Sequence, residues 1–279
     1  MDMTLDAEHL PKPSRVKDLT MRSFGYEWTR FSKVVPEYES WFLRWIAPLR
    51  PEFFKGKLVL DAGCGMGRHT YCASKWGAEV VGMDLSSAVY AAQKNLHQAP
   101  NVHVLRADIY YTPLRRRFDF VYSIGVIHHL HDPQDGVRKL SDLLKPGGKL
   151  LVWVYAKEGN GFAIKFIEPV RRLTTRLPFR TLETLSTLLA IPLYGLSRIA
   201  RLLRWLPPTR TIPYFLYFTR LSNFRVSELK ALVFDILSAP LARYVSSDEI
   251  RSWFANARLH LNTLRWVNRN GWTAIGTAG

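Results

Sequence analysis

Five short apolar runs alternate with helix-like segments between residues 58 and 156, and this alternation constrains the fold more than any other feature of the chain. The runs have the β-branched and aromatic content of strands. Strands that alternate with helices in this way predict an α/β, Rossmann-like, doubly wound and mostly parallel sheet that is covered on both faces. We expect strands at 58–62, 78–84, 102–108, 118–125 and 149–155, and helices at 68–76, 86–97 and 133–144.

Local signals support the helix boundaries. Ser86 or Ser87 is placed to cap the second helix, and Asp132 followed by Pro133 is typical of the start of the third. The tetrad Lys-Pro-Gly-Gly at 145–148 predicts the end of that helix and a turn into the next strand.

Residues 157–240 have a different composition from the alternating region. They carry thirteen Lys or Arg against four Asp or Glu through residue 230, together with Leu-rich helical stretches. After residue 240 a capped helix and a terminal hairpin return to the α/β pattern. We therefore expect an N-terminal helical cap (1–54), one core (55–156 and 241–279), and a basic helical insertion (157–240) between strands five and six that acts as a substrate lid.

The composition narrows the class of protein. A chain of 279 residues with 47% hydrophobic and 13% aromatic content is globular, and its formal net charge of +16 indicates an anionic partner. Cys64 and Cys72 form no C-x-x-C pair, so neither a disulfide framework nor a zinc cluster is indicated. No signal peptide or membrane-spanning run is recognisable. We expect a cytoplasmic protein, with room for peripheral contact at the inner membrane face.

A glycine-rich loop, DAGCGMGR at 61–68, directly follows the first strand. A dinucleotide-binding loop would require a third glycine where this chain has Arg68, and Asp61 would repel a pyrophosphate. A phosphate-binding P-loop would require Gly-Lys-Ser/Thr, which does not follow. The loop therefore favours a cofactor with a positively charged end.

Three acidic residues end three successive strands and complete this interpretation. Gly63 and Gly65 let a ligand approach the backbone, and Asp61 faces its cationic end. Asp84 is placed to accept both hydroxyls of a ribose, and Asp108 to accept from an exocyclic adenine amine. Any one of these acids is also compatible with a capping or solvated role, but their order and βα spacing indicate one site.

These motifs resemble those of the class I S-adenosylmethionine-dependent methyltransferases with a small-molecule type of core. The matching stretches are VLDAGCGMG, VVGMDLS, RADI, SIGVIHHL and LLKPGGKLLV. The resemblance covers about half of the chain and implies a seven-stranded sheet whose last strand is antiparallel. It implies S-adenosylmethionine as cofactor, S-adenosylhomocysteine as product, and cofactor contacts from Asp61, Ala62, Gly63, Cys64, Gly65, Asp84, Leu85, Asp108, Ile109 and Ser123.

The segment FGYEWTRF at 24–31 also resembles a stretch of some of these enzymes in which a helix closes over the cofactor. Tyr26 and Trp28 would then cover its methionine portion. The alternative is that both rings anchor an N-terminal helix on the sheet.

Three histidines follow the fourth strand. His128 or His129 is a candidate general base beside the methyl group, whereas His131 is expected to shape the pocket or cap the next helix. Their spacing is poor for metal ligands, and we expect no metal site.

The acceptor is the least constrained part of the interpretation. The insertion's arginines suggest an anionic group or a membrane surface, and its apolar side chains suggest a hydrophobic acceptor cavity, although both are compatible with ordinary packing and solvation. We expect methylation of a lipophilic or acidic small molecule on O, N or C. The alternatives are a tRNA or RNA methyltransferase, suited to the charge, and a cofactor-binding protein without catalysis. The apolar side chains of the insertion that we expect to line the acceptor cavity are Phe162, Phe166, Leu188, Leu189, Trp205, Phe215 and Phe218.

Overall fold

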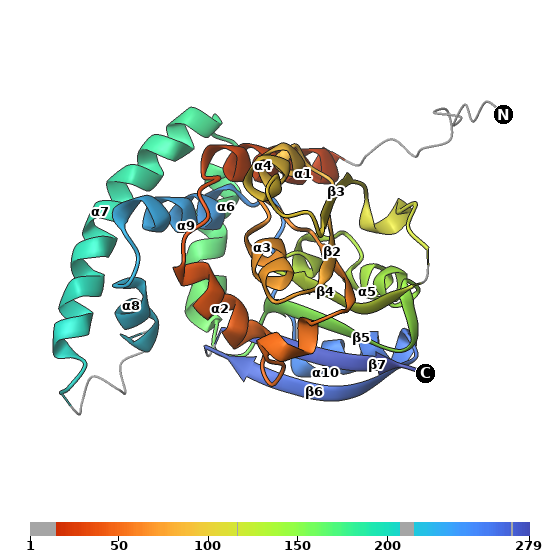
Figure 1. Cartoon of the computed structure of the whole chain (residues 1–279). Helices are drawn as coiled ribbons and strands as arrows, with labels where there is room; N and C mark the ends of the chain where they lie inside the picture. Colours follow the sequence, from red (N-terminus) through yellow and green to blue (C-terminus); the bar gives the residue numbers. More distant parts are fainter. Residues whose placement is uncertain (1–14, 116, 207–214, 269) are drawn as a thin grey trace.

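A single seven-stranded sheet organises the chain, in the strand order β3-β2-β1-β4-β5-β7-β6 (Figure 1). The computed structural model describes residues 15–115, 117–206, 215–268 and 270–279. β1 to β5 pair in parallel, whereas β7 is antiparallel to both β5 and β6. The predicted mostly parallel sheet of seven strands is confirmed. The strands are β1 (Leu58–Ala62), β2 (Glu79–Asp84), β3 (Val102–Arg106), β4 (Phe118–Ile124), β5 (Leu144–Tyr155), β6 (Leu259–Val267) and β7 (Gly271–Ala278).

Helices cover both faces of this sheet. The core helices and turns are η2 (Pro51–Phe54), α3 (Arg68–Lys75), α4 (Ala88–Leu96), η3 (Ile109–Tyr111), η4 (Ile127–His129), α5 (Pro133–Ser141) and α10 (Ser247–Asn256). Two N-terminal helices precede them, α1 (Arg15–Arg30) and α2 (Glu37–Ile46). The segment between β5 and α10 contains a π-helical turn η5 (Ala163–Ile167) and the helices α6 (Glu168–Thr174), α7 (Phe179–Leu203), α8 (Phe215–Leu221) and α9 (Val226–Ser238).

The strands are buried on both sides, which explains their nearly continuous apolar sequence. Val59 and Phe120 face the helices α2 and α3, and Leu60 and Val121 face α5 and α10. Successive side chains of a strand point to opposite faces, so each strand contributes to two separate cores. Because both faces of each strand are packed, the strands are held in a fixed register. The loops that follow the strands are therefore held in place as well.

Some boundaries differ from those expected. α5 ends at Ser141 and β5 already begins at Leu144, so the tetrad at 145–148 lies inside the strand. Leu144 pairs with Phe118 and Lys149 with Phe120, so the tetrad forms an irregularity in the ladder. The predicted helix to residue 144 was therefore too long, because the turn signal marks a bulge and not the strand's start. The expected caps of α5 and α10 are present, from Asp132 and Ser246.

The inserted helices lie beside the sheet, with α7 along the outside of the molecule and α8 and α9 between it and the core (Figure 1). The first 14 residues of the expected N-terminal cap, and residues 207–214 of the expected insertion, lie outside the described ranges. No helix among the described residues is both long and apolar enough to cross a bilayer.

Candidate cofactor and acceptor site

The glycine loop between β1 and α3 is held by tight packing and by hydrogen bonds from its own backbone. Gly63 has a φ of 90°, and a Cβ on it would lie 2.3 Å from Val126 Cγ2, so no other residue fits there. The N–H groups of Gly63 and Cys64 donate to the Met83 carbonyl at 2.7 and 3.0 Å. The loop is thereby tied to the end of β2, and Gly63, Cys64 and Gly65 all line a cavity of about 270 Å³.

Asp84 connects the carboxyl ends of β1 and β2, which the sequence predicted to lie side by side. The Gly65 N–H donates to its Oδ2 at 2.9 Å, and the N–H and hydroxyl of Ser86 donate to its Oδ1 at 2.8 and 2.7 Å. Asp84 and the following Leu85 are both part of the cavity wall. The carboxylate is therefore oriented before any ligand arrives, which is the condition for a specific polar contact.

Asp61 lies behind the loop and is not part of the cavity wall. Its side chain is 1% exposed, and Thr70 Oγ1 donates to its Oδ2 at 2.6 Å. Burial raises the pKa of Asp61 to about 7, and hydrogen bonds to the carboxylate oppose that rise. Ala62 and Ser123 also lie outside the wall, with the Ser123 hydroxyl donating to the Ala62 carbonyl at 2.8 Å. For these three residues a direct cofactor contact stays a prediction.

Asp108 lines the cavity together with Ile109, as the sequence suggested, but it has a partner that the sequence did not indicate. Lys17 of α1 forms an ion pair with Asp108 Oδ2, and the Tyr110 N–H donates to Oδ1 at 3.0 Å. An adenine amine would share this carboxylate with the lysine. The pairing joins residues 91 positions apart and carries no sequence motif, so only the folded structure reveals it.

Trp28 and Tyr26, both expected over the cofactor, face different ways on α1. Trp28 lines the cavity, where its ring lies 4.6 Å from the Arg68 guanidinium, also in the wall. Tyr26 instead donates to Glu183 Oε2 at 2.8 Å and stacks on Phe179, outside the cavity. Tyr26 and Trp28 are two positions apart on α1, so their side chains differ by about 200° in direction and cannot both cover one ligand. The structure thus places Tyr26 as an anchor for the inserted helices.

The histidine pair is also divided. His129 lines the cavity, and its Nδ1 bonds the Leu241 carbonyl. A carbonyl only accepts, so Nδ1 carries the proton and Nε2 keeps its lone pair. Burial lowers the pKa of His129 to about 4, which leaves it neutral at pH 7. His128 is fully buried against Tyr155 and absent from the wall, so of this pair it is His129 that is placed to act as a base. His131 also lines the cavity, beside Tyr110.

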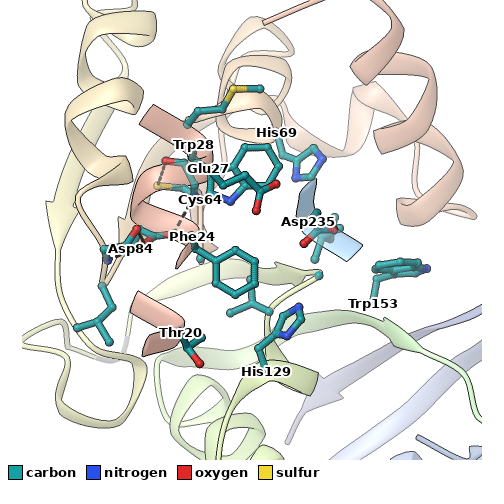
Figure 2. A pocket seen from close by; sticks show the side chains of 18 of the residues that line it. Thr20, Phe24, Glu27, Trp28, Cys64, His69, Asp84, His129, Trp153 and Asp235 are labelled. Carbon is teal, nitrogen blue, oxygen red and sulfur yellow. Dashed lines mark hydrogen bonds between the residues drawn. The ribbon is translucent and has the colours of Figure 1, made fainter. Parts of the chain in front are cut away.

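Three acidic residues that sequence reasoning missed line the same cavity, namely Glu27 of α1 and Glu228 and Asp235 of α9. Figure 2 shows Glu27 and Asp235, and Glu27 Oε2 is buried with no hydrogen-bond partner among the described residues. Burial raises the pKa of Glu27 well above its usual range, and the nearby Asp235 adds to the rise. Burial also raises the pKa of Asp235. Trp45 Nε1, His69 Nε2 and Trp153 Nε1 of the same wall also lack a partner among the described residues, so several polar atoms there could contact a ligand.

The far wall is built from the inserted segment and from aromatic side chains. None of Phe162, Phe166, Leu188, Leu189 and Trp205 lines the cavity, although all were expected to contribute to it; they are exposed instead. Phe215 and Phe218 pack within the inserted helices. The signal was misread because an apolar helical stripe does not show whether it faces a cavity or solvent. The aromatic and inserted residues that do form this wall are Trp41, Trp45, Trp153, Tyr155, Tyr217, Phe224, Ala231, Leu232 and Leu241.

The centre of the chain matches a known family. A family model described as "Methyltransferase domain" matches residues 60–152. A tRNA U34 carboxymethyltransferase of Pseudoalteromonas translucida is 37% identical over 113 residues, or 39% of this chain and 35% of that protein. A ubiquinone biosynthesis O-methyltransferase of Coxiella burnetii is 32% identical over 157 residues, or 53% of this chain and 64% of that protein. The chain thus covers less than two thirds of either relative.

Solved structures agree on the fold. The PH0226 protein of Pyrococcus horikoshii superposes with a TM-score of 0.54 at 16% identity, over 88% of this chain and 92% of that one. Magnesium protoporphyrin IX methyltransferase from Synechocystis, solved with bound S-adenosylhomocysteine, gives 0.50 at 15% identity over 97% and 90%. At such identities the likeness concerns the fold alone.

Proposed function

Since the chain contains a class I S-adenosylmethionine-dependent methyltransferase domain, we propose that it transfers the cofactor's methyl group to a lipophilic small molecule. The observation that carries this proposal is the continuity of one cavity. The same wall includes Gly65 and Asp84 at the strand ends and Tyr217 and Leu232 from the inserted segment. A donor bound at the loop and an acceptor under the inserted helices would therefore meet in one enclosed space.

The residues around the loop fit this cofactor. Gly65 has a φ of 54°, and a Cβ on it would lie 3.3 Å from the Trp28 ring, so a glycine allows this ring to pack directly on the loop. Asp84 presents an oriented carboxylate for ribose hydroxyls, and α3 begins at Arg68 without a side-chain cap, which suits a carboxylate ligand. The unpartnered oxygen of Glu27 suits a cationic centre. When bound, the cofactor supplies a methyl group already activated by its sulfonium charge.

The wall of the acceptor side supports a lipophilic acceptor over an acidic one. Its aromatic rings offer apolar contact, and its charged residues are the acids Glu27, Glu228 and Asp235 and one cation, Arg68, whose guanidinium lies over the Trp28 ring. An anionic acceptor would have to approach these acids. Arg198 and Arg201 of the insertion do not compensate, because both are exposed and absent from the wall. The buried Arg171, which donates to the Ile236 carbonyl of α9, and Arg68 in the wall offset Glu27 and Asp235 only in part, because burial still raises both pKa values. Apolar burial in such a pocket contributes roughly 25 cal/mol per Å².

His129 is the residue we propose as general base. Its Nδ1–H is fixed by the Leu241 carbonyl, which leaves Nε2 as a proton acceptor at the cavity wall. A base of this kind accelerates transfer by about 10²–10⁴-fold, whereas alignment of donor and acceptor supplies roughly 7–11 kcal/mol. Positioning therefore contributes more than His129 does, and an acidic hydroxyl on the acceptor would lose its proton without help.

RNA is the second candidate acceptor. The observation that favours it is the 37% identity to a tRNA U34 carboxymethyltransferase, together with the net charge of +16. That match covers 113 residues, and the O-methyltransferase match covers more of both chains. We rank RNA second because the acceptor wall is apolar and acidic, whereas RNA binding relies on cations and exposed stacking rings.

Labelled methyl transfer separates the two candidates. The protein is incubated with methyl-labelled S-adenosylmethionine and a cell extract, and the label is then divided into organic, RNA and polar small-molecule fractions. We expect counts in the organic phase. Label confined to RNA would instead support the second candidate, and label in no fraction would contradict a methyltransferase of either kind.

The lipophilic acceptor also gives a reason for peripheral membrane contact, because such molecules concentrate in lipid. We propose this contact as part of the function, with the enzyme resting on a bilayer surface while it works.

A further inference from the structure

The outward side of α7 is apolar and exposed over most of its length. Its inward side is buried through Leu182, Ser186, Ala190, Ser197 and Ala200, which pack toward α8 and α9. The outward side chains are spaced so that they share one helical stripe. We call these residues the outer face; they are Leu188, Ile191, Leu196, Ile199 and Leu202, with exposed fractions of 63, 58, 56, 53 and 77%.

The exposed stripe contradicts the simplest expectation for an amphipathic helix. The apolar side of an amphipathic helix normally packs on the core, which would bury Ile199 and Leu202. They are exposed instead, and Trp205 just beyond α7 is 75% exposed. A second exposed stripe of the same kind precedes α7, spaced three or four residues apart through η5 and α6. It consists of Phe162, Phe166, Val170, Leu173 and Leu177.

The charges exposed beside these stripes are all positive. Glu168 and Glu183 are the acidic residues between 162 and 206. Glu168 pairs with Arg171, and Glu183 faces inward, where it pairs with Arg30 and Lys230. The exposed basic residues of the same stretch are Lys165, Arg172, Arg176, Arg180, Arg198, Arg201 and Arg204.

We infer that the outer face of α7 docks on an anionic lipid surface. An exposed apolar stripe that runs from Leu188 to Leu202 marks an interaction site, because soluble proteins rarely leave such a surface uncovered. A helix with one apolar side flanked by Lys and Arg lies in the plane of a membrane interface, with its apolar side among the acyl chains and its cations at the phosphates. A second copy of this chain is a poorer occupant, because the same arginines would meet each other.

This inference rests on the proposed function and adds to it a place where the enzyme would meet a lipophilic acceptor. α7 packs on α9, and α9 supplies Ala231, Leu232 and Asp235 to the cavity wall. The lipid surface and the acceptor end of the cavity are therefore separated by the inserted helices alone. A lipophilic acceptor in the bilayer would be close to the site in which it reacts.

The test is vesicle sedimentation with the full chain. Phosphatidylcholine vesicles with and without phosphatidylglycerol are compared for the parent protein and two triple variants. One carries Leu188→Ser, Ile199→Ser and Leu202→Ser, and the other carries Arg198→Gln, Arg201→Gln and Arg204→Gln. Tyr90→Ser is the matched control, because Tyr90 of α4 is also 63% exposed and lies away from the inserted helices.

We expect the parent protein and Tyr90→Ser to bind phosphatidylglycerol vesicles, and both triple variants to bind about tenfold more weakly. Lipids with brominated acyl chains should quench tryptophan emission, and Trp205→Phe should remove part of that quenching. S-adenosylhomocysteine affinity should be the same in every variant, because none of these residues lines the cavity. This readout separates lipid docking from the proposed methyl transfer.

Three results would overturn the inference. The parent protein could fail to sediment with anionic vesicles, or the apolar variant could sediment as well as the parent. A dimer that Leu202→Ser dissociates, without any lipid binding, would assign the face to a second copy of the chain.

Discussion

Individual carboxyl groups in this protein are held away from bulk water, and their protonation is coupled to folding. Glu27 is 1% exposed with a pKa well above its usual range because of burial, and burial raises the pKa of Asp61 to about 7. A raised pKa means that the folded state favours the protonated form. The stability that this contributes is complete below pH 4 and is lost as the pH rises through the folded-state pKa values.

Glu27→Gln should therefore stabilise the ligand-free protein at pH 8 and have little effect at pH 4. The glutamine keeps the shape of the protonated acid and carries no charge that must be buried, so the gain in stability should increase as the pH rises. Thermal unfolding of the parent and the variant across this pH range measures it. Glu52→Gln, at an exposed glutamate, is the control. Equal shifts for both variants would show that Glu27 is not a buried acid.

Asp84→Asn should weaken S-adenosylhomocysteine binding. The amide keeps one oxygen acceptor, but an N–H₂ group replaces the other carboxylate oxygen. That group cannot accept the hydrogen bond that Gly65 or Ser86 now donates to Asp84. Hydrogen bonds to a charged group contribute roughly 1.5–3 kcal/mol, which corresponds to about a 10- to 100-fold rise in Kd. Calorimetry with Asp142→Asn as an exposed control measures the change. An unaltered Kd would defeat the role assigned to Asp84.

His129→Asn should lower turnover by about 100-fold while leaving cofactor affinity unchanged. The asparagine amide can still donate to the Leu241 carbonyl, but the Nε2 lone pair is gone. His97→Asn is a matched control, because His97 Nδ1 also contacts a backbone carbonyl, that of Lys94, at an exposed site. Because burial lowers the pKa of His129 to about 4, its ionisation should not alter turnover between pH 6 and 8. Full activity in His129→Asn would remove the proposed base.

Motif reasoning at this scale located the residues that follow strands and missed those on helices. Asp84 is the last residue of β2 and Gly65 follows β1, so the pairing of these two strands brings them together. Lys17, Glu27 and Asp235 come from α1 and α9, whose direction depends on packing against the rest of the molecule. A helical spacing identifies a face but does not say what the face meets, so their convergence could not be predicted.

Among the helices, α1 connects the side of the cavity that is proposed to hold the nucleotide with the side that is proposed to hold the acceptor. Lys17 reaches Asp108, Trp28 covers Gly65, and Ser23 donates to the Ser238 carbonyl at the end of α9 at 2.9 Å. The inserted helices in turn cover Tyr26 and Trp41 of the N-terminal helices. Removal of residues 157–240 would expose these rings, so point substitutions test the lid more cleanly than a deletion does.

Leu232→Trp should obstruct the acceptor end of the cavity. The larger ring enters the wall between α9 and the aromatic side chains, and transfer of label to the extract should fall about tenfold. S-adenosylhomocysteine affinity should persist, because Leu232 belongs to α9 and not to the glycine loop. Leu232→Met, which keeps the volume, is the control. Undiminished transfer in a stably folded Leu232→Trp protein would show that the acceptor does not pass this wall.

For the whole molecule, the sheet was predictable and the use of the inserted helices was not. Alternating strands and helices between 58 and 156 specify a parallel sheet, since each buried strand requires cover on two faces. The basic and apolar composition of residues 157–240 was compatible with two roles, either as the wall of a cavity or as an exposed apolar face. The structure divides these roles between elements: α8 and α9 supply residues to the cavity, while α7 carries the exposed apolar face.

Titration of the full chain with S-adenosylhomocysteine shows whether a cofactor binds at the glycine loop, and the proposed methyl transfer requires that binding. We predict saturable heats with one molecule bound per chain, and binding that weakens in Asp84→Asn but not in Asp142→Asn. Heats that match simple dilution for the folded parent protein would contradict the account.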